Sequence, residues 1–260
     1  MSDTPSNAYP SFQTIGVTGI PEIDPGDNLG SLISDAAREQ GTPIAKGDIL
    51  VVTQKIVSKA EDRLVSLDEV NPSEFARAFA RGAGRDPRLI ELVLQESRAI
   101  VRMDPSRGVL ITETWHGFVC ANAGIDQSNV PGEDVVCLLP LDPDSSARRI
   151  RAEVQAKSGV APPLIISDTF GRAWREGHVN FAIGVAGMDP MTDYRGTLDA
   201  QGRPLHVTTI AVADELAATA ELVTAKAINV PAAIIRGHPY ATAEGSVAAL
   251  IRDRARDLFR

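Results

Sequence analysis

Residues 164–178 read LIISDTFGRAWREGH, a short apolar run followed at once by a polar stretch. The run Leu164 to Ser167 predicts a buried strand. The residues after it supply a carboxylate, a hydroxyl, glycines and two arginines. Carboxylate and hydroxyl oxygens bind hard cations, whereas arginine with glycine is typical of phosphate sites. We therefore predict a loop at a strand end that handles metal and phosphate.

A second stretch, residues 116–129, reads HGFVCANAGIDQSN and has the same design. Asp126 and Asp168 each follow an apolar run, so we expect both to project from strand ends into one cleft. Mg²⁺ and Mn²⁺ take few protein ligands and keep waters and substrate phosphates, which suits two aspartates from separate loops. Thr169 can add a hydroxyl or carbonyl oxygen. The alternative is that both aspartates only cap turns, but the neighbouring arginines favour a metal site.

Arg172, Arg175 and His178 lie within one short segment. Arginine suits phosphate recognition because its planar fork offers paired donors. The alternative is a solvated surface loop with Trp174 packed inward.

Lys55 and Lys59 follow a continuous apolar strand predicted over 49–53. A lysine just beyond a strand end can serve as a point charge for a nucleotide phosphate, although a solvent-facing lysine is the commoner case. The sequence has no GxxxxGK[ST] motif and no HxH or HxxxH spacing, which argues against a P-loop enzyme and against a zinc site. Cys120 and Cys137 are too few for a disulfide framework, and we expect small buried side chains there.

The composition narrows the class of protein. The chain has 260 residues, a formal net charge of -8 and 43% hydrophobic residues. These values indicate one large domain or two intimate subdomains over 14–260, after a flexible tail over 1–13. The acidic balance argues against a nonspecific nucleic-acid binder. Residues 1–14 lack the apolar core of a secretory signal, and no run approaches the roughly 20 apolar residues that span a bilayer, so we predict a cytoplasmic protein.

Local patterns predict helices and strands without regular alternation, which favours an α+β fold over a doubly wound sheet. Helices are predicted over 29–39, 72–82, 87–96, 142–157, 214–227 and 241–259. Strands are predicted over 15–23, 49–53, 109–113, 117–120, 135–139, 164–167, 205–212 and 232–235.

Four stretches together resemble the coenzyme F420-0:L-glutamate ligase family, also called gamma-glutamyl ligases, in its single-domain form. They are QKIVSKAE (54–61), the 116–129 stretch, SDTFGR (167–172) and ADELA (213–217). The similarity runs from GIPEI (19–23) to IIRG (234–237) and so covers nearly the whole chain.

The resemblance implies a mixed-sheet α+β subunit that pairs into an intertwined homodimer. It also implies that L-glutamate is joined to the deazaflavin precursor F420-0 through an acyl phosphate made from GTP. Two divalent cations, Mg²⁺ or Mn²⁺, are expected in each site, and a monovalent cation such as K⁺ is compatible with it. Asp126 and Asp168 match ligands of one metal, and Thr169 matches a ligand of the second.

The resemblance also assigns nucleotide contacts and catalytic roles. Positions matching GTP contacts are Ile20, Pro21, Glu22, Ile23, Gln54, Lys55, Lys59, Asn129, Thr224, Ala225, Lys226, Ala227, Ile228, Asn229, Val230 and Pro231. Lys59, Arg172 and Arg175 would add positive charge as phosphoryl charge redistributes. Glu176 and His178 are both candidates for the base that deprotonates the glutamate amine.

The chain departs from the family pattern at three places. Ala173 stands where proline is common, Asp62 replaces a usual glycine, and residues 224–226 read Thr-Ala-Lys where Met-Gly-Lys or Met-Gly-Gln is expected. A protonated Lys226 cannot ligate a metal, so the full set of ligands of the second metal stays unassigned. A metal-dependent phosphohydrolase and a catalytically idle nucleotide-binding relative stay open as alternative functions.

Overall fold

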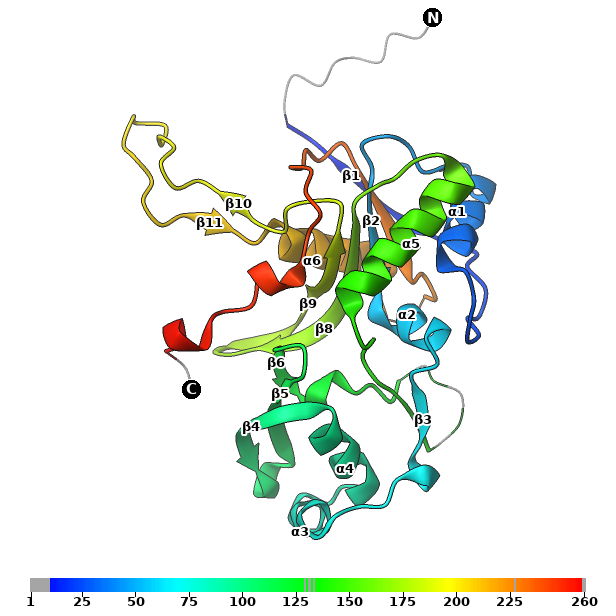
Figure 1. Ribbon diagram of the computed structural model, residues 1–260, viewed down its shortest axis with the longest axis vertical. Helices are drawn as coiled ribbons and strands as arrows, with labels where there is room; N and C mark the ends of the chain where they lie inside the picture. Colours follow the sequence, from blue (N-terminus) through cyan, green and yellow to red (C-terminus); the bar gives the residue numbers. More distant parts are fainter. Residues whose placement is uncertain (1–9, 129, 131, 133, 227, 259–260) are drawn as a thin grey trace, which may run out of the picture.

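A five-stranded mixed sheet lies at the centre of this computed structural model, which describes residues 10–258 except 129, 131, 133 and 227 (Figure 1). The strand order is β1 (Gln13–Val17), β12 (Ala232–Arg236), β2 (Ile49–Thr53), β8 (Leu164–Arg172) and β9 (Arg175–Ala186). Only the central pair, β2 with β8, runs parallel. The fold is therefore α+β with a mixed sheet, as the sequence predicted.

Helices cover both faces of this sheet. Helices α1 (Leu29–Glu39) and α5 (Pro143–Ser158) pack on one face, and α6 (Val212–Thr224) packs on the other. Along β2, Leu50 and Val52 join the core under α1 and α5, whereas Ile49 and Val51 join the core under α6. Because side chains alternate along a strand, a strand covered on both faces must be apolar throughout. This confirms the prediction for 49–53.

Between β2 and α5 the chain leaves the sheet through α2 (Gln54–Ala60) and builds a smaller region below it (Figure 1). Its helices are α3 (Glu74–Ala83) and α4 (Pro87–Gln95). Its strands form the pair β3 (Leu64–Ser66) and β7 (Val135–Cys137), and a three-stranded sheet of β4 (Ser97–Asp104), β5 (Val109–Thr114) and β6 (Val119–Ala121). Three short 3-10 turns connect them: η1 (Leu67–Glu69), η2 (Pro105–Arg107) and η3 (Asn122–Gly124). It has separate hydrophobic clusters, including one around Phe79 and Ile90 and one around Leu67 and Leu138.

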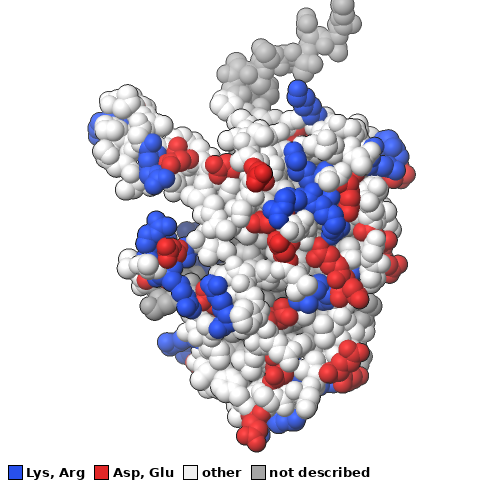
Figure 2. Space-filling model, viewed as in Figure 1, with Lys and Arg blue, Asp and Glu red and all other residues white. Residues whose placement is uncertain are grey.

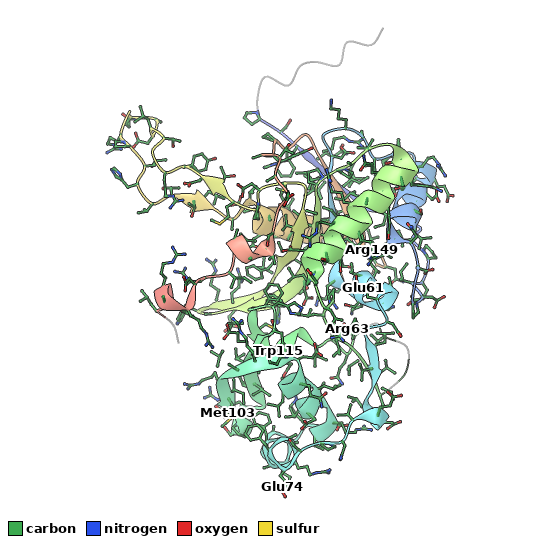
Figure 3. All side chains as sticks on the ribbon, viewed as in Figure 1. Glu61, Arg63, Glu74, Met103, Trp115 and Arg149 are labelled. Carbon is green, nitrogen blue, oxygen red and sulfur yellow. The ribbon has the colours of Figure 1, made fainter. Side chains whose placement is uncertain are left out.

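Ion pairs fasten the smaller region to the sheet (Figure 3). Arg149 of α5 lies 2.6 Å from the carboxylate of Glu61, just after α2. Arg63 pairs with Glu96 at 2.9 Å and also donates to the carbonyl oxygen of Leu139 at 3.0 Å. These contacts fix the direction in which the chain leaves and re-enters the sheet.

Helix ends follow local capping chemistry, which is why most helix predictions are confirmed. Asn28, Ser73, Asp86 and Asp142 each accept a hydrogen bond from a backbone amide in the first turn of α1, α3, α4 and α5. A side-chain acceptor satisfies one of the amides that a helix leaves unpaired at its start. Helix α5 then ends at Gly159, whose φ of 77° closes the last turn.

Two predictions for the long polar stretch and the C-terminus are wrong. Residues 168–178 form no loop but the paired ends of β8 and β9, which turn at Ala173 and Trp174. The β-formers at Thr169, Phe170 and Val179 explain the extended backbone.

The predicted final helix over 241–259 is absent from the part of it described here. The segment contains only the 3-10 turns η4 (Val247–Ala249) and η5 (Arg254–Arg256). Gly245 has a φ of 81°, and Asp253 accepts from the amide of Ala255, which starts a separate turn. Arg254 then pairs with the buried Glu113 at 2.8 Å, so tertiary contacts override the helical spacing.

The remaining differences lie at strand ends. The strand predicted over 15–23 begins at Gln13 and ends at Val17, because Gly19 has a φ of 77° and Pro21 follows. The strand predicted over 205–212 shrinks to β11 (Thr209–Ile210), which pairs with β10 (Thr192–Asp193) in an arm that projects from the body (Figure 1). Cys120 and Cys137 are free and buried, as predicted. No helix in the described part of the chain is long and apolar enough to cross a bilayer.

Two departures from the family pattern fall at left-handed backbone positions. Asp62 has a φ of 54° and Ala225 a φ of 32°. Glycine adopts such angles without steric penalty, and aspartate tolerates them better than alanine. The backbone thus keeps a glycine-like course at both places although the side chains differ, and Ala225 carries the greater strain.

We predict that Ala225→Gly raises the free energy of unfolding by about 1 kcal/mol, because it removes strain that exceeds the entropy glycine adds to the unfolded chain. Asp62→Gly is the matched control and should change stability by less. Urea unfolding followed by circular dichroism measures both. An Ala225→Gly variant less stable than the parent would contradict the strain.

Candidate active site

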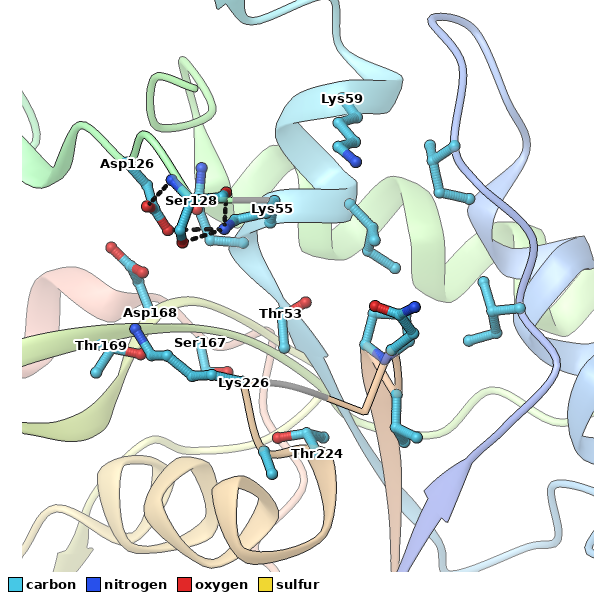
Figure 4. Close-up of a pocket in the computed structure, with 18 of the residues that line it drawn as sticks. Thr53, Lys55, Lys59, Asp126, Ser128, Ser167, Asp168, Thr169, Thr224 and Lys226 are labelled. Carbon is cyan, nitrogen blue, oxygen red and sulfur yellow. Dashed lines mark hydrogen bonds and ion pairs between the residues drawn. The ribbon is translucent and has the colours of Figure 1, made fainter. Parts of the chain in front are cut away.

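The larger of two cavities, of about 250 Å³, opens beyond Thr53 and Ser167, where the parallel pairing of β2 with β8 ends (Figure 4). Ligands of α/β sheets bind outside the carboxyl ends of parallel strands, since loops diverge there and leave a crevice. Its wall is formed by Ile20, Pro21, Glu22, Ile23, Thr53, Gln54, Lys55, Ile56, Lys59, Asp126, Ser128, Ser167, Asp168, Thr169, Asn180, Glu221, Thr224, Ala225, Lys226, Asn229, Val230 and Pro231. Segments far apart in the sequence thus meet at one place.

Helix α2 brings two lysines to this wall. Lys59 is only 7% exposed and pairs with Glu22, which lies in the loop after β1. Lys55 lies 2.8 Å from the Asp126 carboxylate and donates to the Ser128 hydroxyl at 2.9 Å. Neither lysine is an ordinary surface lysine, because each ammonium group is paired with a carboxylate at the cavity wall.

Asp126 and Asp168 arrive from different parts of the fold and line the same cavity. Asp168 lies within β8, and Asp126 forms an isolated bridge with Cys137 in the smaller region. Burial raises the pKa of Asp168 to about 7, and the charge of Asp126 adds to this rise. Burial also opposes ionisation of Asp126, but hydrogen bonds from Lys55 and Ser128 outweigh it and lower its pKa.

The donor set fits a hard divalent cation. The charge of Asp126 opposes ionisation of Asp168, and a cation between the two carboxylates would remove this penalty. The Thr169 hydroxyl donates to the amide oxygen of Asn180 at 2.7 Å, which leaves its oxygen lone pairs available. Across the described residues no group of three or more His, Cys, Asp or Glu side chains converges. Oxygens of a substrate or water would therefore complete the shell around a metal held here, as is usual for Mg²⁺.

A second cavity of about 210 Å³ adjoins the carboxylates. It is lined by Ala121, Gly124, Ile125, Asp126, Asp168, Thr169, Phe170, Gly171, His178 and Lys226. Among the described residues, the two cavities have Asp126, Asp168, Thr169 and Lys226 in common. Lys226 reaches from the end of α6 toward Asp168 at this junction, and its charge lowers the pKa of that aspartate (Figure 4).

The predicted site residues divide into those that meet and those that do not. Nearly all of the predicted nucleotide positions that are described line the larger cavity, with Ile228 as the exception. His178 lines the second cavity. Arg172, Arg175 and Glu176 line neither, since they lie near the turn between β8 and β9, where Arg172 donates to the Glu176 carbonyl oxygen at 2.6 Å. Asn129 and Ala227 fall outside the described residues.

Sequence reasoning missed several cavity residues, notably Thr53, Ser128, Ser167, Asn180 and Glu221. The hydroxyl of Ser167 is buried and has no hydrogen-bond partner among the described residues. Its position directly before Asp168, on a strand otherwise apolar to that point, was the available signal. Asn180 gave no such signal, because only the pairing of β8 with β9 sets it opposite Thr169.

Charge over the whole surface does not explain ligand choice. On the face seen in Figure 2, acidic and basic side chains are mixed rather than gathered by sign. The formal net charge of -8 would repel an anionic ligand at long range. The lysines of the cavity wall are therefore the groups that could attract a phosphate.

Over most of its length the chain is similar to one protein family and to named members of it. Residues 18–237 match the family model described as F420-0:Gamma-glutamyl ligase. The coenzyme F420:L-glutamate ligase of Methanothermobacter thermautotrophicus is 47% identical over 249 residues, which cover 95% of this chain and 98% of that protein. The protein of the same name from Methanopyrus kandleri is 44% identical over 244 residues, which cover 92% of this chain and 94% of that protein.

We predict that Asp168→Asn stabilises the metal-free protein at pH 8 but not at pH 4.5. The pKa of a carboxyl group is about 3.9 in the unfolded chain, and that of Asp168 in the fold is about 7. Unfolding therefore releases a proton between these values, so the wild type loses stability as pH rises from about 4 to 7. Asparagine removes this penalty and should add more than about 1 kcal/mol at pH 8.

Thermal unfolding in EDTA at both pH values measures this difference. Asp24→Asn is the control, since Asp24 is exposed and lines neither cavity. An equal change in Tm at pH 4.5 and pH 8 would show that burial does not oppose ionisation of Asp168.

Proposed function

The chain belongs to the F420-0:gamma-glutamyl ligase family, and we propose that it joins L-glutamate to F420-0 with GTP as the source of energy. It is an enzyme of coenzyme F420 biosynthesis, a ligase that forms an amide. The proposal concerns the means: a GTP phosphate activates the F420-0 carboxylate as an acyl phosphate, which the glutamate amine then attacks.

One observation carries the proposal. Two aspartates from separately packed parts of the chain converge beside two lysines, at the junction of two cavities. A carboxylate resists attack by an amine until it is activated, so a ligase must first hold a polyphosphate and a carboxylate together. A cavity with lysines in its wall, which meets a second cavity at a pair of metal-type ligands, supports that task.

The larger cavity supports binding of the nucleotide. Lys55 and Lys59 would supply point charges for phosphates, and Thr224 and Lys226 lie across the cavity from them. In the structure each lysine is held by a carboxylate, Asp126 or Glu22. A triphosphate would compete with these carboxylates for the same ammonium groups. The lysines are already positioned by their partners, so they would move little when the nucleotide binds.

Asp126, Asp168 and Thr169 would hold the divalent cations. When bound, Mg²⁺ or Mn²⁺ neutralises charge on the phosphates and orients the transferring group. Lys226 is placed to add a fixed positive charge beside Asp168. Arg172 and Arg175 keep their proposed catalytic role only if the turn between β8 and β9 moves toward the carboxylates, since neither lines a cavity here.

For proton removal from the glutamate amine, the geometry favours His178 over Glu176. The imidazole of His178 lines the second cavity, whereas Glu176 lies beyond it near the hairpin turn. A general base must come within hydrogen-bond reach of the proton it removes. The intertwined homodimer, the K⁺ ion and the cytoplasmic location stay predictions that rest on the resemblance.

We predict that the purified protein, given F420-0, GTP, Mn²⁺ and L-glutamate, yields glutamate adducts by mass spectrometry, and that omitting GTP abolishes them. Asp168→Asn should lower the rate by about 100-fold or more, because the transition state loses a preorganised charge. Asp24→Asn should leave it unchanged.

Other outcomes separate the alternative functions. Steady GDP release that does not depend on glutamate or F420-0 would indicate a phosphohydrolase. Nucleotide binding without any turnover would indicate an idle relative, and full activity in Asp168→Asn would contradict the metal role.

A further inference from the structure

We propose that the second cavity is the acceptor site, where the carboxylate end of F420-0 enters against Phe170, Gly171 and His178 while the nucleotide stays in the larger cavity. This inference rests on the proposed function, because it divides the two substrates of that reaction between the two cavities.

The meeting of the cavities is the first argument. In phosphoryl transfer the attacking and leaving oxygens lie roughly in line, on opposite sides of the transferring phosphorus. Donor and acceptor must therefore approach one point from opposite directions. Among the described residues the cavities have Asp126, Asp168, Thr169 and Lys226 in common, and their other lining residues differ. A nucleotide in the larger cavity would place its terminal phosphate at that junction. A second molecule could then approach the same phosphate through the second cavity.

Charge distribution is the second argument. The larger cavity has Lys55 and Lys59 in addition to the shared Lys226, which suits a polyphosphate. In the second cavity Lys226 is the only lysine or arginine of the described lining, and His178 is the only other nitrogen base. Acidic side chains line both cavities, with Glu22 and Glu221 in the larger one only. The argument therefore rests on the number of ammonium groups that could bind phosphate oxygens, which is greater in the larger cavity.

Aromatic neighbours hold Phe170 in the wall of the second cavity. Its ring centroid lies 6.1 Å from that of Phe181 and 6.2 Å from that of Phe118. Aromatic side chains packed in this way hold their positions, so this part of the cavity is formed before a ligand arrives. Ala121 and Ile125 add apolar surface, and the rest of the lining is largely polar.

Gly171 makes the space for the acceptor. It pairs with His178 across the hairpin, and a Cβ atom at Gly171 would meet only the His178 ring, at 4.0 Å. Its backbone is not left-handed, so the fold does not require glycine here. A side chain at this position would be tolerated by the strand and would project into the cavity.

The decisive experiment places valine at Gly171 and compares two Michaelis constants in the complete ligation reaction. Valine suits a strand, and its methyl groups would occupy space that the acceptor needs. We expect the KM for F420-0 to rise by about tenfold or more, while the KM for GTP and the affinity for GDP with Mn²⁺ change by less than about twofold. Ala173→Val is the matched control, because Ala173 lies on the same hairpin outside both cavities.

Several outcomes would overturn the inference. They are a rise in the KM for GTP with that for F420-0 unchanged, an equal rise in both, and no change in either. If Gly171→Val fails to bind GDP or to unfold cooperatively, the smaller change Gly171→Ala takes its place, with a smaller expected rise in the KM for F420-0 and the same unchanged KM for GTP. A wild-type protein that makes no glutamate adduct would instead refute the proposed function, so the two failures are distinguishable.

Discussion

The parallel pairing of β2 with β8 is the constraint on which the site depends. Because both strands run the same way, Thr53 and Ser167 end up side by side. The residues that follow them therefore lie at the same end of the sheet. These are the lysines of α2, which comes directly after β2, and Asp168, which comes directly after Ser167. An antiparallel register would send these groups to opposite ends. The burial of both strands between α1, α5 and α6 makes this register the one that keeps apolar side chains covered.

Electrostatic balance at this edge is local and prearranged. Lys55 compensates Asp126, Glu22 compensates Lys59, and Lys226 partly offsets the charge of Asp168. The ion pairs therefore offset part of the cost of placing these charges beside one another. Asp168 is the exception, because burial and the charge of Asp126 together raise its pKa to about 7 despite the nearby Lys226. A buried carboxylate with incomplete compensation is common where an enzyme binds a cation.

The sequence predicted which side chains line the cavities better than it predicted the helices and strands that carry them. Local chemistry was enough for the capped helices and for the apolar strand 49–53, because the signals lie within a few residues. It was enough for Asp126 and Asp168 too, whose separate stretches meet as predicted. It failed where tertiary contacts decide the outcome, as at the C-terminus, where Arg254 is drawn to the buried Glu113. It also could not place Arg172 and Arg175, because strand pairing rather than composition determines how far a hairpin extends.

The isolated bridge between Asp126 and Cys137 gives the site a mechanical role. Asp168 belongs to the central sheet, whereas Asp126 is carried by a region with hydrophobic clusters of its own. The two parts already share a core, since Phe118 and Leu139 of the smaller region pack with residues of the central sheet and its helices. A divalent cation bound to both carboxylates would add a second link between them. Because such a cation would bind only the folded arrangement, it would raise the stability of the contact between the two parts.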